Sequence, residues 1–113
     1  MKRLLLLVFV VACSRQTPYS LIGDAQRGQV KVGQYGCTAC HVVPDVEGSG
    51  AVGPPLNHMA SRLYIAGEFP NVPQHMVRWI DNPQAMKPHD AMPNLNVSRR
   101  DARDIAAYLY TLR

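Results

Sequence analysis

The sequence predicts a small all-α fold of four to five helices, and three observations support this prediction. Near the C-terminus, apolar residues recur at the spacing of one helix face: Ile105, Tyr108, Leu109 and Leu112. Residues that favour helix starts, such as Asp24, Pro73 and Ser98, precede the periodic segments. No stretch alternates apolar and polar residues as a half-buried strand does. A chain of 113 residues has room for one such domain.

Residues 1–12 have the pattern of an export signal. A basic start, Met1-Lys2-Arg3, is followed by an apolar run over 4–11 that is too short to span a bilayer. The run ends at Cys13 in a segment that resembles the lipobox of bacterial lipoproteins, where the cysteine is diacylated and becomes the mature N-terminus. An ordinary cleaved signal peptide, or an uncleaved anchor, is the alternative and leaves Cys13 incidental.

This interpretation divides the chain into a signal peptide over 1–12, a lipidated N-terminus and tether over 13–23, and one domain over 24–113. The protein is then exported and lipid-anchored at a bacterial membrane, facing the periplasm or the cell exterior. Because the leader contains two basic residues, its removal leaves a formal charge two units below the +4 of the whole chain. The basic cluster of Arg99, Arg100 and Arg103 is expected to be a solvated helix face. The charge gives no reason to expect a nucleic-acid partner.

The first half of the domain is predicted to be a helix, a loop and a second helix. The first helix runs from Asp24 to about Tyr35, and Gly36 ends it. The segment 44–55 is rich in glycine and proline and is expected to be a loop. A short helix over 59–66, closed by Gly67, is expected to follow.

The second half is predicted to hold two helices and a long connection. One helix begins at Pro73, has an apolar side that includes Met76, and stops at Pro83. The segment 82–97 shows no periodicity, and a stretch of that length inside a small domain is normally functional. The last helix follows Ser98, which is expected to cap it.

The strongest chemical signal is the segment Cys37-Thr38-Ala39-Cys40-His41. C-x-x-C-H is the attachment signature of c-type haem. Two residues between the cysteines let one turn of chain present both sulfurs to the vinyl groups of one porphyrin edge. The histidine that follows then lies where its imidazole can coordinate the iron.

Three other roles for the two cysteines fit the sequence less well. A thioredoxin-like dithiol would need a βαβ context, which the sequence lacks. A zinc site would need a second pair of cysteines or well-spaced histidines. A disulfide between Cys37 and Cys40 would close only a very small loop. The export signal and the flanking helix and loop favour haem attachment.

Residues 24–113 resemble a class I monohaem cytochrome c, in which the helices wrap around one covalently bound haem. Residues 53–113 most resemble the cytochrome domains fused to subunit II of some haem–copper oxidases. The matching segments are Gly28 with Tyr108-Leu109 at the helix crossing, Gly53-Pro54-Pro55-Leu56, Trp79-Ile80-Asp81-Asn82-Pro83-Gln84 and Lys87-Pro88-His89-Asp90-Ala91-Met92-Pro93. The pair His89-Asp90 departs from the pattern, since relatives often have a small residue there.

The resemblance implies a role for several haem-binding residues. The Pro54 carbonyl, in the turn that ends at Leu56, would receive the N–H of His41, and Met92 would be the distal ligand. Trp79 and Arg62 would bond to or pair with the haem propionates. Without the resemblance, Trp79 is equally well a core residue and Arg62 a solvated helix charge.

The candidates for the distal ligand also differ in their sequence positions, without regard to the resemblance. Met76 falls on the apolar side of a helix and Met59 is expected in the core. Met86 lies in the long connection but lacks the following proline that Met92 has. His89 is the serious rival of Met92, because it lies in the same loop and imidazole is a strong iron ligand. His58 and His75 are expected to be exposed or helix-terminal.

Ligation by His41 and Met92 would leave no open iron site, so the expected function is outer-sphere electron transfer without a small-molecule substrate. The chain is then an electron carrier and not an enzyme. The expected partners are membrane redox complexes, such as a quinol-oxidising complex and a terminal oxidase, or other cytochromes. Two alternatives remain: a haem subunit held permanently in an oxidase or dehydrogenase complex, and a haem sensor or peroxidase.

Overall fold

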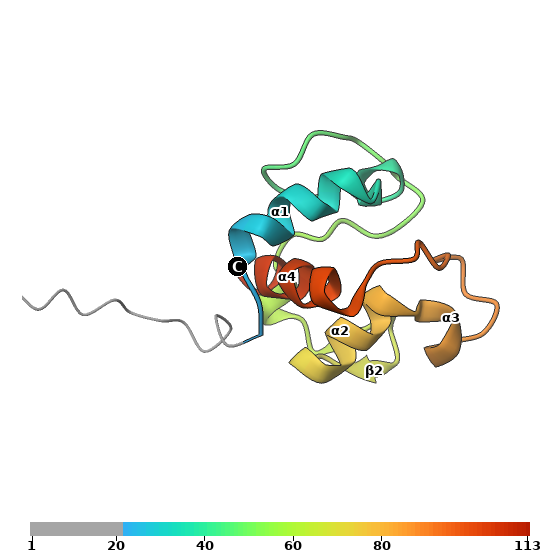
Figure 1. The fold of residues 1–113 in the computed structure, drawn as a ribbon. Helices are drawn as coiled ribbons and strands as arrows, with labels where there is room; N and C mark the ends of the chain where they lie inside the picture. Colours follow the sequence, from blue (N-terminus) through green and yellow to red (C-terminus); the bar gives the residue numbers. More distant parts are fainter. Residues whose placement is uncertain (1–21) are drawn as a thin grey trace, which may run out of the picture.

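The computed structural model describes residues 22–113 and is helix-rich (Figure 1). Cys13, the expected signal peptide and most of the expected tether lie outside the described residues. The elements are α1 (Ala25–Gln34), the 3-10 turns η2 (Cys37–Ala39) and η3 (Met59–Ser61), β1 (Tyr64–Ile65), β2 (Phe69–Pro70), α2 (Pro73–Asp81), α3 (Pro83–Met86) and α4 (Arg99–Leu109). The main prediction of a small helical fold is confirmed within residues 22–113.

Helix α4 lies between α1 and α2 (Figure 1). Asp24 caps α1 by accepting a hydrogen bond from the Arg27 N–H at 2.9 Å, and Ser98 caps α4 by accepting one from the Asp101 N–H at 3.1 Å. The two helices touch at Gly28, where a Cβ would lie 1.9 Å from the Asp104 carbonyl oxygen. A residue without a side chain is therefore required for this close crossing.

The core lies between α4 and its two neighbours. Met76 of α2 and Ile105 of α4 are almost fully buried, and Val32 of α1 reaches the same cluster. The apolar stripe predicted for the last helix is buried as expected. The helix itself ends at Leu109, so Leu112 packs from the turn that follows it.

The prediction of a helix over 59–66 is wrong. Only Met59–Ser61 forms a 3-10 turn, and β1 then pairs antiparallel with β2. The side-chain amide of Asn71 donates to the carbonyls of Met59 and Arg62, both at 2.8 Å, and so occupies acceptors that a continuing helix would use. Ala66 and Gly67 both have positive φ and reverse the chain between the strands.

The segment 82–97 also holds more structure than its sequence predicts. Pro83 ends α2 as expected, but Asn82 then caps α3 by accepting a hydrogen bond from the Ala85 N–H at 3.1 Å. The proline therefore stands at the first turn of a new short helix, a position that tolerates its missing N–H. Within residues 22–113 no helix is long and apolar enough to cross a membrane.

Candidate functional site

The C-x-x-C-H segment follows directly on α1. Gly36 has φ +73°, which lets the chain leave the helix and enter η2. The His41 N–H donates to the Cys37 carbonyl at 3.0 Å, so the five residues close into one turn. Cys37 and Cys40 are half-buried and neither is in a disulfide. One turn of chain thus presents two thiols and an imidazole together.

The environment of Cys37 does not suit thiol redox chemistry. Burial raises the pKa of the Cys37 thiol, although a backbone hydrogen bond lowers it in part. A reactive dithiol needs a thiolate, and hence a pKa lowered by a nearby positive charge or helix N-terminus. A raised pKa of Cys37 disfavours a thioredoxin-like role for this pair.

The His41 imidazole is oriented by the second loop. Its Nδ1 lies 2.6 Å from the Pro54 carbonyl oxygen, the contact that the family resemblance implies. A carbonyl oxygen only accepts hydrogen bonds, so Nδ1 carries the proton and donates. In the neutral imidazole, the other ring nitrogen, Nε2, then has a lone pair available for a metal.

Two backbone hydrogen bonds hold the loops on either side of this contact. The Gly53 N–H donates to the Cys40 carbonyl and the Leu56 N–H to the Val42 carbonyl, each at 2.8 Å. A Cβ on Gly53 would lie 2.3 Å from Cε1 of His41. The glycine of the Gly-Pro-Pro-Leu segment is therefore required by the imidazole that packs against it, a role that the turn motif did not reveal.

Arg62 lies beside this turn rather than on a solvated helix face. It is half-buried and follows η3 in extended conformation. Its Nη2 donates to the carbonyls of Pro55 and Asn57, the latter at 2.9 Å. Trp79 is buried in α2, with its ring 6.1 Å from that of Phe69.

The methionines separate into two groups. Met59 and Met76 are buried in the core, as expected. Met86 and Met92 are partly buried and pack against the edge of the core, Met92 within the loop that connects α3 to α4. His89, the rival ligand in the same loop, is exposed and has φ +68°. His58 is exposed, and His75 lies in the first turn of α2.

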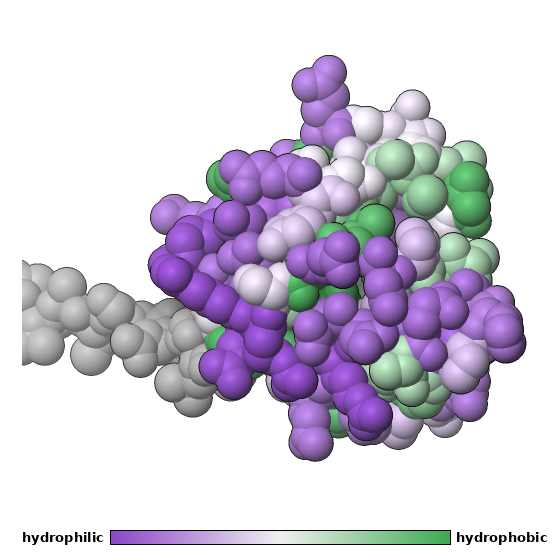
Figure 2. Space-filling view, turned by 45° about the vertical axis from the view of Figure 1, so that its right-hand side comes forward, coloured by the Kyte–Doolittle hydropathy of each residue, from purple (hydrophilic) through white to green (hydrophobic). Residues whose placement is uncertain are grey.

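The residues of this region fit a covalently bound porphyrin. The turn over 37–41 supplies two free thiols and an imidazole whose neutral form has a lone pair on Nε2, and the loop between α3 and α4 carries a half-buried thioether, Met92. Large apolar side chains are exposed close to His41 and to the following loops: Val42 at 42%, Val52 at 79% and Leu63 at 79%. Figure 2 shows hydrophobic residues gathered at the upper right, apart from the hydrophilic face. An apolar macrocycle would cover surface of this kind.

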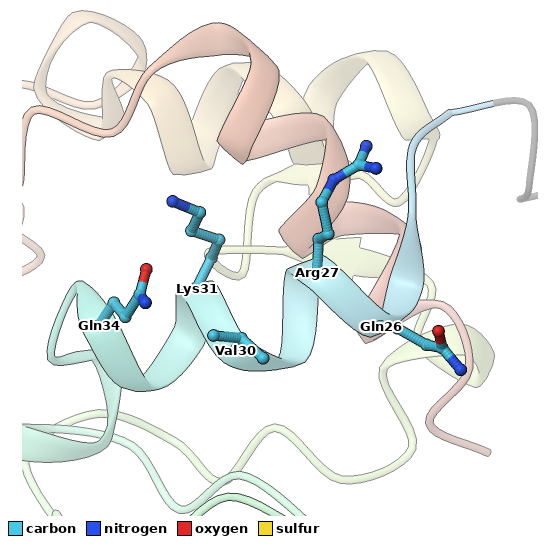
Figure 3. A pocket seen from close by; sticks show the side chains of 5 residues that line it. All are labelled: Gln26, Arg27, Val30, Lys31 and Gln34. Atoms are coloured by element: carbon cyan, nitrogen blue, oxygen red, sulfur yellow. The ribbon is translucent and has the colours of Figure 1, made fainter.

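A hollow along α1 lacks such donors. It is shallow and lined by Gln26, Arg27, Val30, Lys31 and Gln34 (Figure 3). Arg27 and Lys31 extend toward α4, where they pair with Asp104 at 2.9 Å and Asp101 at 3.5 Å. Its lining contains no thiol, imidazole or thioether, so it is not the candidate site.

Comparison with known proteins places these observations in a family. The family model described as Cytochrome c matches residues 25–113. The chain is 32% identical over 91 residues to cytochrome c oxidase subunit 2 of Alkalihalophilus pseudofirmus. That match covers 79% of this chain and 26% of the relative, so the chain spans about a quarter of that protein.

Solved structures share the fold. Ferric cytochrome c-550 from Paracoccus versutus superposes with a TM-score of 0.61 at 20% identity, covering 80% of this chain and 98% of that one. Cytochrome c2 from Rhodobacter sphaeroides gives a TM-score of 0.60 at 22% identity, covering 80% of this chain and 96% of that one. At these identities the likeness concerns the fold alone.

Proposed function

Because the chain belongs to the cytochrome c family, we propose that it is a membrane-tethered electron carrier whose haem iron is ligated by His41 and Met92. Family membership by itself supports one covalent c-type haem and a role in haem-based electron transfer. It indicates a carrier and gives no sign of enzymatic activity.

We assign attachment of the haem to Cys37 and Cys40, with His41 as the proximal ligand. The observation that supports this most strongly is the 2.6 Å contact between His41 Nδ1 and the Pro54 carbonyl oxygen. It fixes the tautomer and the ring orientation, and it makes the imidazole a stronger electron donor at Nε2. The Gly53 and Leu56 backbone bonds keep that carbonyl in place.

Met92 is the proposed distal ligand. Its side chain is partly buried against the core, whereas that of His89 is exposed. The haem supplies a one-electron ferrous–ferric couple, and a thioether ligand raises its potential. If His41 and Met92 both bind the iron, no small molecule would bind the metal, which disfavours the sensor or peroxidase alternative.

The proposed partners are membrane redox complexes. A lipid on Cys13 would hold the domain at the outer face of a bacterial membrane, where quinol-oxidising complexes, terminal oxidases and other cytochromes are found. The 32% identity to an oxidase subunit supports a second candidate, a haem subunit held permanently in such a complex. Purification in mild detergent separates the two, because a fixed subunit co-elutes with its complex and a carrier does not.

The ligand assignment is tested by the weak far-red sulfur-to-iron charge-transfer band of the oxidised protein. Met92→Ala is expected to remove this band and to lower the reduction potential, since the thioether favours ferrous iron. His89→Ala is expected to leave both unchanged. If His89→Ala alters the ligation and Met92→Ala does not, the centre is bis-histidine and the assignment is wrong.

A further inference from the structure

One side-chain amide makes three hydrogen bonds to the backbone of the Met92 loop. Gln84, in α3, donates from Nε2 to the carbonyls of Asp90 and Met92, each at 2.8 Å. Its Oε1 accepts from the His89 N–H at 3.0 Å. Both donor hydrogens of the amide and one of its acceptor sites are therefore used on this loop.

The loop has little other backbone support. Within residues 88–97 of the described chain, the backbone forms one backbone–backbone hydrogen bond, from the Asp90 N–H to the Lys87 carbonyl at 3.2 Å. The Asp90 carboxylate adds a local bond, accepting from the Met92 N–H at 3.0 Å. The Gln84 amide thus takes the place of the regular hydrogen bonds that a helix or strand would provide.

Gln84 is itself held in place by the packing and capping of α3. Pro83 beside it is almost fully buried, and Asn82 caps the same short helix. The Gln84 N–H also donates to the Asn94 side chain at 3.2 Å, which ties the far end of the loop to α3. The amide is therefore anchored in the helical core and reaches outward to the loop.

We propose that Gln84 is a positioning residue that holds the Met92 thioether at the iron. The inference rests on the proposed ligation by Met92. An iron–thioether bond is stronger when the loop that supplies the sulfur is already ordered, because ordering the loop on binding costs conformational entropy. The same amide binds the His89 backbone while the His89 side chain is exposed, so it favours sulfur over imidazole.

The test measures how easily an external ligand displaces the methionine from the oxidised holoprotein. Imidazole is titrated while the far-red charge-transfer band is followed, in wild type, Gln84→Ala and Gln84→Glu. Gln84→Glu keeps the size and an acceptor for the His89 N–H but cannot donate to the Asp90 and Met92 carbonyls. Both variants lose the two donated bonds and are expected to bind imidazole about tenfold more tightly, the net effect expected from losing two such bonds.

Gln29→Ala is the matched control. Its amide also donates to a loop carbonyl, that of Asp45 at 2.9 Å, in the segment that follows His41. It should bind imidazole as wild type does. Haem staining after denaturing electrophoresis and far-ultraviolet circular dichroism report whether each variant is loaded and folded.

The outcomes separate the two proposals. A band in wild type with unchanged imidazole affinity in both Gln84 variants would overturn the role of Gln84 and leave Met92 as the ligand. Tighter binding in Gln84→Ala alone would show that packing, not the donated bonds, positions the loop, and would also overturn it. Absence of the band in wild type would overturn the ligation and this inference together.

Discussion

The two residues next to the His41 imidazole, Gly53 and Pro54, pack so closely against it that no larger side chain fits at position 53. Gly53 lies directly against the imidazole, and the Pro54 carbonyl beyond it accepts the Nδ1 proton. The ring therefore has one orientation that satisfies both neighbours. The orientation of the His41 ring therefore depends on the space that Gly53 leaves as much as on the hydrogen bond to Pro54.

Gly53→Ala is expected to displace the His41 ring, because the new methyl group would lie 2.3 Å from Cε1. We expect a lower yield of haem-loaded protein and a loss of about 1–3 kcal/mol in the free energy of unfolding. Haem staining and urea unfolding followed in the Soret band measure the two effects. Ala51→Ser, at an exposed position in the same loop, is the control. Wild-type loading and stability of Gly53→Ala would contradict the steric argument.

Asp104 is a buried charge with a specific set of partners. Its carboxylate accepts from the Asp24 N–H at 2.8 Å and from Arg27 Nε at 2.9 Å. Burial acts to raise the pKa of Asp104, but the hydrogen bonds and the positive charges of Arg27 and Arg100 outweigh it, so the pKa lies below its usual 3.8. The carboxylate therefore stabilises the fold above about pH 4, and this contribution is lost as the pH falls through the lowered pKa.

Asp104→Asn is expected to lower the free energy of unfolding at pH 7 by about 1 kcal/mol. Arg27 is half exposed, so water can solvate its charge when the partner is lost. The difference between variant and wild type should shrink below pH 4, because wild type then also loses the charge. Urea unfolding at pH 7 and pH 3 measures this. Glu47→Gln, at an exposed carboxylate, should have the unfolding free energy of wild type at both pH values. If the Asp104→Asn variant is destabilised equally at pH 7 and pH 3, the carboxylate charge is not the cause.

At the scale of elements, the crossing of α1 and α4 positions the haem-attachment segment. These helices come from opposite ends of the domain and meet at Gly28, and η2 follows directly on α1. The Tyr108 hydroxyl of α4 donates to the Pro44 carbonyl, which ties the loop after His41 to the same helix. A change in the crossing is therefore transmitted to the haem-attachment segment.

Gly28→Ala would place a methyl group 1.9 Å from the Asp104 carbonyl oxygen, so the helices must separate. The expected loss is about 3 kcal/mol, larger than the roughly 1 kcal/mol that alanine gains in helix propensity. Gly33→Ala on the same helix meets only the Val46 side chain, at 3.8 Å, and should be neutral or slightly stabilising. Thermal unfolding of the two variants compares them directly. Equal melting temperatures would argue against a close crossing.

At the scale of the molecule, the start of the described chain and the loop that carries Met92 lie at different places along α4. At its start Gly23 lies against the backbone of Arg103, in the middle of α4. The loop between α3 and α4 extends past the N-terminal end of that helix (Figure 1). A tether over 14–23 spans at most about 35 Å when extended, at roughly 3.3–3.6 Å per residue. Lipidation at Cys13 would keep the haem near one membrane face and raise its effective concentration there.

Cys13→Ser is expected to release the protein into the soluble exported fraction with its haem intact. Electron delivery to a membrane oxidase should then fall at equal expression, because the local concentration is lost. Fractionation, haem staining and mass spectrometry of the N-terminal peptide provide the measurements. A wild-type peptide without acyl mass, or a variant that stays on the membrane, would contradict the lipoprotein interpretation.

The sequence alone determined what depends on neighbours along the chain. The spacing of Cys37, Cys40 and His41, the caps at Asp24 and Ser98 and the apolar stripe of the last helix are local patterns, and their physical causes act within a few residues. Family motifs added Pro54 as the partner of His41, a contact that the structure contains.

Only the tertiary structure decided what depends on residues distant in sequence. The Asn71 amide takes the Met59 and Arg62 carbonyls and prevents the predicted helix over 59–66. Likewise, Gly53 shows its steric role only once two loops meet at the imidazole. Such hydrogen bonds and close approaches leave no periodic pattern in the sequence. They form only after segments distant in sequence have come together, and only then do they outweigh the local preference for a helix.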